Sequence, residues 1–294
     1  MLDEIILKLK RHKNKAIILV VALVVLDFLI FWQISGEGRT NRDLRIYFLD
    51  VGQGDSELVL LPGGVKVLID GGPPNSRILG NLEKIILPTD RYIDLVMMSH
   101  PQLDHFGGLI DVFKRYRVGA FLTNGRKGEA QAFADLEKII EENSVKTVVL
   151  AKNDVIRYEN NHFKIISPDK NTLQAKELND TVLVAELTSN NSKTLFTGDI
   201  GVNIEEELLK VFNSPIDILK VAHHGSKYSS FGGFLEVLNP KVAVIEVGKN
   251  SYGHPTAEVL KRLEGVGSKI FRTDLDGIIE LIIDGQTIKV LKNI

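Results

Sequence analysis

Residues 99–108 read SHPQLDHFGG, and this stretch decides how the chain folds around its site. It overlaps the end of an apolar run that predicts a buried strand over residues 93–99. His100, Asp104 and His105 are therefore crowded at the end of a strand, and two glycines let the chain turn directly after them. Imidazole nitrogens and carboxylate oxygens in one small volume suit zinc or manganese. The stretch thus predicts a metal site.

Further candidates for this site lie later in the chain. Asp199 ends a Thr-Gly-Asp sequence that follows another apolar run. His223 and His224 open a His-His-Gly-Ser turn after a third run, and His254 sits between glycine and proline. One such histidine is usually a hydrogen-bonded turn residue. Five of the seven histidines at strand ends favour a shared site.

The apolar pattern predicts many short strands with helices between them. Strands are expected over residues 45–51, 57–61, 65–70, 93–99, 118–123, 147–151, 155–158, 163–167, 182–187, 193–197, 216–221 and 242–247, with a terminal hairpin at Asp284-Gly285. Helices are expected over residues 78–87, 109–116, 130–142, 202–212, 231–238 and 256–263. This order favours two sheets in a sandwich covered by helices, and it leaves the strand order open.

In combination, these motifs resemble the metallo-β-lactamase-fold superfamily, whose signature is His-x-His-x-Asp-His, a later Gly-Asp and a later His-Gly. Residues 44–291 are similar in particular to the C-terminal hydrolase-like domain of ComEC-type competence proteins, which take up DNA. The likeness rests on motifs at residues 48–56, 68–72, 99–108, 179–180, 197–199, 220–226 and 253–255. It implies an α/β fold, a four-layer αββα sandwich with the metal between the sheet edges.

The resemblance also implies two metal positions, and this sequence departs from the pattern at the first. His100 matches there, but Gln102 replaces the second histidine and Asn179-Asp180 stands where the third is expected. The ligands implied for the second position are all present: Asp104, His105, Asp199 and His224. We therefore expect one tightly held divalent ion, zinc or manganese, and at most a weak second one.

The same residues supply candidates for proton transfer. Asp104 or Asp199 could accept a proton from the attacking water, because either carboxylate would lie beside the metal. His254 or His223 could donate to the leaving oxygen or contact a phosphate.

Residues around the motifs are expected to support the site. Asp70 is expected to orient a metal ligand from behind rather than to bind the metal. Lys220 and Lys227 flank the histidine pair, and each could contact a phosphate, although Lys227 could equally be solvated. Residues 50–56 predict a loop near the mouth of the site, with Gly52 and Gly54 serving a tight turn.

Residues 16–35 predict a transmembrane anchor. The run from residue 16 to 32 is apolar except for Asp27, and with the next three residues it reaches the roughly 20 residues that span a bilayer. The flank at residues 1–15 is basic, which places it in the cytoplasm and the rest of the chain outside. A cleaved signal peptide is the alternative, but the bulky residues 31–34 lack a small-x-small site. Residues 36–43 form a linker, and residues 44–294 form the hydrolase domain.

Composition limits the kinds of partner. The chain has 36 basic and 38 acidic residues, and its first 35 residues hold five and three of these, so the remainder has a net charge of −4. Such a domain does not hold DNA by bulk electrostatics. There is no cysteine, which excludes disulfides and thiolate ligands.

These observations predict a membrane-anchored, metal-dependent hydrolase with three alternatives for its role. The resemblance implies a phosphodiesterase or nuclease that acts on single-stranded DNA during uptake, with a competence channel as partner. The same site could instead hydrolyse another extracellular phosphoester, such as a phosphocholine or teichoic-acid-like group. Thirdly, the incomplete first metal position suits a catalytically inactive domain that binds DNA or a partner. That position also disfavours a lactamase, and the sequence leaves the oligomeric state open.

Overall fold

The computed structural model describes residues 15, 17–31, 43–212, 214–285 and 287–293. The chain divides into two units, residues 1–42 and 43–294. Residues 17–31 of the first unit are helical. None of the helices within the described ranges is long and apolar enough to cross a membrane. Most of the predicted basic flank, both ends of the predicted anchor (16 and 32–35) and most of the predicted linker lie outside the described residues.

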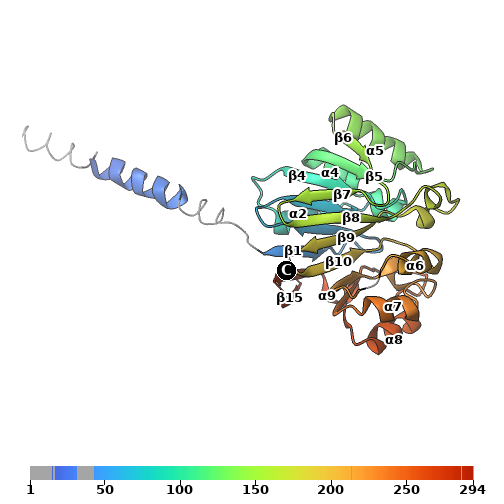
Figure 1. Ribbon diagram of the computed structural model, residues 1–294. Helices are drawn as coiled ribbons and strands as arrows, with labels where there is room; N and C mark the ends of the chain where they lie inside the picture. Colours follow the sequence, from blue (N-terminus) through green and yellow to red (C-terminus); the bar gives the residue numbers. More distant parts are fainter. Residues whose placement is uncertain (1–14, 16, 32–42, 213, 286, 294) are drawn as a thin grey trace, which may run out of the picture. The chain divides into compact units, whose positions relative to one another are not determined.

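Two β-sheets form the centre of the second unit (Figure 1). In the described part of the chain, one sheet has eight strands in the order β15 (Thr287–Lys292), β14 (Ile279–Asp284), β1 (Leu44–Phe48), β2 (Glu57–Leu60), β3 (Lys66–Ile69), β4 (Tyr92–Met97), β5 (Arg117–Thr123) and β6 (Lys146–Val149). The other has seven described strands in the order β13 (Lys269–Arg272), β12 (Val242–Ile245), β11 (Ile218–Lys220), β10 (Ser192–Phe196), β9 (Val184–Ser189), β8 (Asn161–Ser167) and β7 (Val155–Tyr158).

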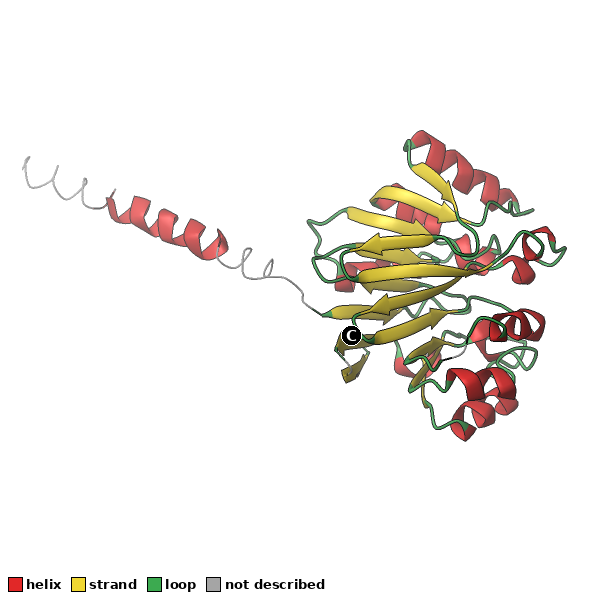
Figure 2. Ribbon diagram, in the orientation of Figure 1, coloured by secondary structure: helices red, strands yellow, loops and turns green. Residues whose placement is uncertain are grey.

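Helices cover the outer faces of both sheets (Figure 2). The first sheet is accompanied by α2 (Arg77–Ile85), α3 (Leu103–Phe106), α4 (Leu109–Arg115) and α5 (Gln131–Glu142). The second is accompanied by α6 (Val202–Leu209), α7 (Gly232–Leu238) and α8 (Ala257–Gly265). The remaining described helical turns are η1 (Thr172–Gln174), η2 (Leu178–Thr181), η3 (Ala222–Gly225) and α9 (Thr273–Asp276).

The hydrophobic core follows from the alternation of side chains along the strands. Ile46 and Phe48 of β1 point into a cluster shared by the two sheets, whereas Tyr47 points to the cluster under α2, α4 and α5. Residues of β11 divide in the same way, with Ile218 between the sheets and Leu219 under the outer helices. Clusters between and outside the sheets make four layers, as predicted from the family resemblance.

Parallel pairing brings the ends of distant strands to one place. β3, β4, β5 and β6 run parallel to one another in the first sheet, and β10, β11, β12 and β13 do so in the second. Because the carboxyl ends of parallel strands meet at one edge, the loops after β4, β10 and β11 can share a site.

The structure refines the predicted elements at a few points. The strand expected over residues 93–99 ends at Met97, and a four-residue helix that was not predicted, α3, begins at Leu103. β13 and α9 were also not predicted, because their short sequences carry little periodicity. The terminal hairpin predicted at Asp284-Gly285 is confirmed by the antiparallel pairing of β14 with β15.

Candidate metal centre

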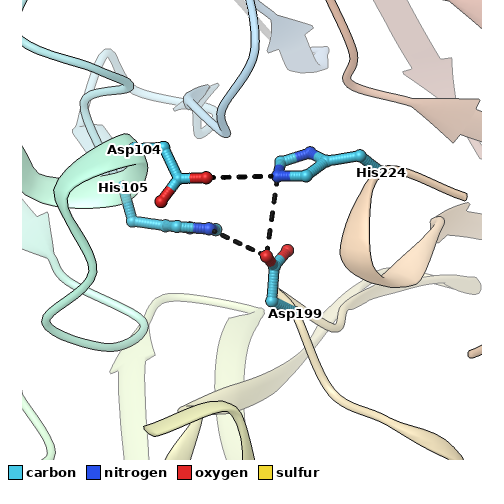
Figure 3. Close-up of side chains that lie close together, drawn as sticks. All are labelled: Asp104, His105, Asp199 and His224. Atoms are coloured by element: carbon cyan, nitrogen blue, oxygen red, sulfur yellow. Dashed lines mark ion pairs between the residues drawn. The ribbon is translucent and has the colours of Figure 1, made fainter. Parts of the chain in front are cut away.

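Four side chains from three segments converge where the two sheets meet. Asp104 and His105 belong to α3, Asp199 follows β10, and His224 belongs to η3, after β11. Each offers one ligand atom, and these atoms all lie within 4.8 Å of one another. Figure 3 shows both imidazoles pointing toward the carboxylate of Asp199.

The distances between these ligand atoms match those around a small cation. Nε2 of His105 lies 3.3 Å from Oδ2 of Asp199, and Nε2 of His224 lies 3.5 Å from the same oxygen and 3.6 Å from Oδ2 of Asp104. A tetrahedral ion with bonds of 2.0–2.1 Å places its ligands about 3.3–3.4 Å apart. These three distances are therefore close to those expected around one zinc ion.

Buried polar atoms without partners support the same conclusion. Nε2 of His105, Nε2 of His224 and Oδ1 of Asp199 are buried and have no hydrogen-bond partner among the described atoms. An unpaired buried polar atom costs about 1–3 kcal/mol. A divalent ion at this point would satisfy these atoms, so the residues present fit a metal.

The opposite ring nitrogens of both histidines are held in place from behind. Nδ1 of His105 lies 2.8 Å from Oδ2 of Asp70, which is the supporting role predicted for Asp70. Nδ1 of His224 lies 2.8 Å from the backbone oxygen of Glu246. A hydrogen on each Nδ1 leaves the lone pair of Nε2 free to face the centre.

Asp70 is itself fixed by the loop that follows β4. The backbone N–H of Ser99 donates to Oδ1 of Asp70 at 2.7 Å, and the hydroxyl of Ser99 donates to Oδ2 at 2.5 Å. Ser99 thus fixes Asp70, and Asp70 in turn orients His105.

A buried ion pair underlies the centre. Lys220 and Asp55 are both fully buried, and the ammonium of Lys220 donates to Oδ2 of Asp55. Oδ1 of Asp55 lies 3.2 Å from Nδ1 of His224, and Nζ of Lys220 lies 3.9 Å from Oδ1 of Asp199. The prediction that Lys220 contacts a phosphate is wrong, because this side chain is enclosed and paired.

The loop before β2 also lies deeper than predicted. Residues 54–56 are buried beneath the centre rather than exposed at its mouth, although residues 52 and 53 are partly exposed. A side chain at Gly54, whose φ is +150°, would collide with the backbone oxygen of Asp104. Glycine is therefore required here for the close approach of the two loops.

The turn that carries His223 and His224 has an unusual backbone. Both residues adopt the left-handed conformation, with φ of 50° and 53°. Such residues cost about 1–3 kcal/mol and persist where surrounding contacts hold them. The backbone N–H of His223 donates to the oxygen of Gly198 at 3.1 Å, which ties this turn to the loop of Asp199. As a result His224 points into the centre while His223 remains 32% exposed.

The centre favours positive charge. Burial lowers the pKa of His224, but Asp199 and Asp55 raise it by more, to about 10. Burial raises the pKa of Asp199, but His224 and His105 lower it by more, so this carboxylate remains ionised. The surplus of carboxylates therefore attracts cations to this point.

The residues of the first predicted metal position lie beside this group rather than in it. His100 is fully buried, and its ring centroid lies 4.2 Å from that of His105. Burial lowers the pKa of His100 to about 3, so the imidazole is uncharged. Gln102, Asn179 and Asp180 line a hollow of about 490 Å³ that Asp199 also faces. The assignment of His100 as a ligand stays a prediction.

The two candidate proton donors lie at the mouth of the centre. Nε2 of His223 is 3.7 Å from Oδ2 of Asp199. The ring of His254 is 5.7 Å from that of His223 and lies farther from the four ligands along the same row of rings. His223 therefore reaches the hollow that Asp199 faces, whereas His254 lines the neighbouring hollow.

Asp55, Lys220 and Glu246 surround the centre, although their positions there were not predicted from the sequence. The sequence contained a sign that Asp55 and Lys220 are buried, because both are charged residues next to apolar strands. Burial of two opposite charges suggests a pair. The partner of each could not be identified, since the two lie 165 residues apart.

Comparison with known proteins gives a family for this chain. Residues 49–248 match the family model described as the metallo-beta-lactamase superfamily. Because this range covers more than half of the chain and includes all four candidate ligands, it concerns the whole metal centre.

Several curated proteins are similar in sequence. ComE operon protein 3 of Bacillus subtilis (strain 168) is 31% identical over 270 residues, which cover 84% of this chain and 33% of that protein. Competence protein ComA of Neisseria gonorrhoeae is 27% identical, covering 83% of this chain and 33% of that protein. Recombination protein 2 of Haemophilus influenzae is 27% identical, covering 87% of this chain and 30% of that protein. The chain thus spans about a third of the length of these relatives.

Solved structures with little sequence identity have the same fold. YhfI of Bacillus subtilis, a metallo-beta-lactamase fold protein, has a TM-score of 0.55 at 11% identity, covering 81% of this chain and 99% of YhfI. Igni18, a metallo hydrolase from Ignicoccus hospitalis, has a TM-score of 0.55 at 14% identity, covering 82% of this chain and 100% of Igni18. At this level of identity the likeness concerns the fold alone.

Proposed function

This chain belongs to the metallo-β-lactamase superfamily, and we propose that it is a metal-dependent phosphodiesterase that cleaves single-stranded DNA. The main support is the convergence of Asp104, His105, Asp199 and His224, with buried ligand atoms that lack other partners. Two imidazoles and two carboxylates suit zinc or manganese, and they leave room for a water.

Each of the four residues can hold the metal, and the chain adds groups for proton transfer. A bound divalent ion would polarise a phosphoryl oxygen and lower the pKa of a water molecule. Asp104 is the ligand whose side chain is open to solvent, at 36% exposure, so its carboxylate is placed to accept a proton from the attacking water. Asp199 is enclosed by His105, His224 and Lys220 and is expected to serve as a ligand only.

His223 is the nearest candidate for contact with the substrate. Burial lowers the pKa of His223, so its imidazole is uncharged near neutral pH. It can donate one N–H to a phosphate or leaving oxygen in the hollow before Asp199. His254, one ring farther out, is expected to contact the next part of the substrate.

The choice of DNA as substrate depends on the named relatives. The names of two relatives refer to recombination and competence, which are processes that involve DNA. Both relatives match most of the length of this chain. A site that holds one divalent ion and presents an imidazole is suited to a phosphodiester. We therefore place DNA before other phosphoesters.

Metal loading and cleavage test this proposal directly. The full-length chain is stripped with EDTA, titrated calorimetrically with Mn²⁺ or Zn²⁺, and assayed with a single-stranded oligonucleotide and with bis(p-nitrophenyl) phosphate. We expect about one equivalent of metal to bind. Asp199→Asn and His224→Ala should each weaken metal binding and lower the cleavage rate at least about a hundredfold, because each removes a ligand.

His162→Ala is the matched control, since His162 lies on β8 and is not among the residues of the centre. It should leave metal binding and cleavage unchanged. Absence of cleavage with every divalent metal at full occupancy would eliminate the phosphodiesterase and favour a binding domain. Cleavage of bis(p-nitrophenyl) phosphate but not of the oligonucleotide would favour another phosphoester as the substrate.

We also propose that residues 16–35 anchor the chain in the membrane, with the hydrolase domain on the extracytoplasmic side. This proposal is supported by the apolar run and by the basic residues before it. A channel that passes DNA across the membrane would then be a suitable partner. The site would cut DNA on the outer face.

A further inference from the structure

Two exposed tyrosines stand at the mouth of the metal centre. Tyr228 and Tyr252 are 70% and 74% exposed, more than any other large apolar or aromatic side chain in the described residues of the second unit. Large apolar groups that stay in water beside a site mark a binding surface. Their position, rather than their exposure alone, indicates what they bind.

His223 and Tyr228 both line two hollows beside the metal centre. The first hollow, of about 490 Å³, includes Asp199 of the metal centre together with His223 and Tyr228. The second, of about 560 Å³, includes His223, Tyr228, Tyr252 and His254. A substrate cleaved at the centre can therefore extend past His223 into a space lined by both tyrosines.

A row of rings leads from the surface to the centre. The ring centroids of Tyr252 and His254 are 5.7 Å apart at an interplanar angle of 30°. Those of His254 and His223 are 5.7 Å apart at 79°, and those of His223 and His224 are 6.2 Å apart. A row of four rings thus extends from the candidate ligand His224 to the surface, with separations typical of aromatic pairs.

Lys227 supplies the charge at this surface. It is exposed, and its Nζ lies 5.0 Å from the centroid of the Tyr228 ring. A cation in this place attracts a phosphate and repels a quaternary ammonium group such as choline. Glu177 and Asp180 line the first hollow, whereas Glu258 is the acidic residue that lines the second, so the second hollow accepts the phosphate chain more readily.

We propose that Tyr228 and Tyr252 form a base-stacking site for the nucleotides next to the cleaved phosphodiester, which selects single-stranded nucleic acid. The inference rests on the proposed phosphodiesterase function and names the groups that recognise its substrate. Bases of a single strand expose their faces, whereas those of a duplex are covered by their neighbours. The domain has a net charge of −4, so it gains little affinity from bulk electrostatics and depends on stacking.

Binding without cleavage tests the stacking site separately from catalysis. Fluorescence anisotropy in EDTA gives the Kd of a labelled single-stranded oligo(dT) and of an abasic oligomer with the same number of phosphates. Tyr228→Ala and Tyr252→Ala should each raise the Kd for oligo(dT) about tenfold, because one stacked base contributes roughly 1–3 kcal/mol. Both variants should bind the abasic oligomer as the unchanged chain does.

Conservative variants separate stacking from structural damage. Tyr228→Phe and Tyr252→Phe keep an aromatic face and should bind oligo(dT) within about twofold of the unchanged chain. Tyr92→Ala is the matched control, because Tyr92 is the next most exposed described tyrosine and lies on β4 outside both hollows. It should have no effect.

Three results would overturn the stacking site. The two alanine variants could bind oligo(dT) as tightly as the unchanged chain, the unchanged chain could bind the abasic oligomer as tightly as oligo(dT), or choline could compete with oligo(dT) for binding. Cleavage assays with Mn²⁺ report on the phosphodiesterase alone. If oligo(dT) is cleaved but the alanine variants bind it normally, only the stacking site fails. If oligo(dT) binds through the tyrosines and no phosphodiester is cleaved, only the phosphodiesterase fails.

Discussion

Lys220 carries a positive charge into one of the most enclosed parts of the domain. Its side chain is fully buried, and its nearest counter-charge is the equally buried Asp55. Moving such charges out of water is costly, and a pair of this kind is stable only while both partners are present. The pair therefore couples the stability of the domain to the geometry of the metal centre, because Asp55 also faces His224.

Lys220→Met should lower the free energy of unfolding by about 3–5 kcal/mol, because it leaves the buried carboxylate of Asp55 without its lysine partner. Urea denaturation in EDTA measures this without a contribution from metal. The double variant Asp55→Asn/Lys220→Met should lose clearly less stability than the sum of the two single variants. Additive losses would show that the two side chains do not interact.

The residues of the centre differ in how far the sequence predicted them. The histidines and aspartates were identified from local motifs, since each stands at the end of an apolar run. The role of Asp70 behind a ligand was also predicted and is confirmed by its contact with His105. The Asp55–Lys220 pair was not, because local sequence does not reveal which buried charge meets another.

At the level of elements, α6 and α7 are joined through one carboxylate. Glu205 of α6 is fully buried and accepts hydrogen bonds from the backbone N–H groups of Ser230 and Phe231, which precede α7. Burial raises the pKa of Glu205 to about 7, although the two N–H groups lower it in part. A helix terminus near the metal loops is thus held by a side chain that titrates near neutral pH.

Glu205→Gln should remove part of the pH dependence of stability. The folded chain holds the proton of Glu205 more tightly than the unfolded chain, so the protonated form adds stability that is complete below pH 4.5 and is lost as the pH rises through about 7. The stability of Glu205→Gln relative to the unchanged chain should therefore rise from pH 5 to pH 8, by at most about 3 kcal/mol.

Urea denaturation in EDTA across this range measures the difference. Glu206→Gln is the control, because Glu206 is the exposed neighbour on the same helix. A constant difference between Glu205→Gln and the unchanged chain at all pH values would contradict the assignment.

Element prediction succeeded where the periodicity was long. The helix predicted over residues 130–142 is observed as α5, since its apolar face repeats over three turns. α3 was missed because four residues are too few to show a helical period, yet this single turn places Asp104 and His105. One of the shortest described helices therefore contributes more residues to the site than the longer helices do.

At the scale of the whole molecule, the proposed anchor sets which compartment the site faces. Because the chain has no cysteine, a single introduced thiol reports its own location. Glu129→Cys, at an exposed position of the hydrolase domain, should react with a membrane-impermeant maleimide in intact cells. Lys10→Cys should react only after lysis, because the positive-inside rule places it in the cytoplasm. If Lys10→Cys were labelled in intact cells and Glu129→Cys were not, the topology would be the opposite of the proposed one.

The sequence by itself determined the class of fold, the family and the identity of the candidate ligands, because strand periodicity and ligand chemistry are local properties of the chain. The tertiary structure decided which of these residues share one centre. It brought α3, the end of β10 and η3 to a common edge through parallel pairing in two sheets. It also enclosed Lys220 with Asp55 and left Tyr228 and Tyr252 in water. Such outcomes depend on contacts between residues far apart in the sequence, which no local pattern contains.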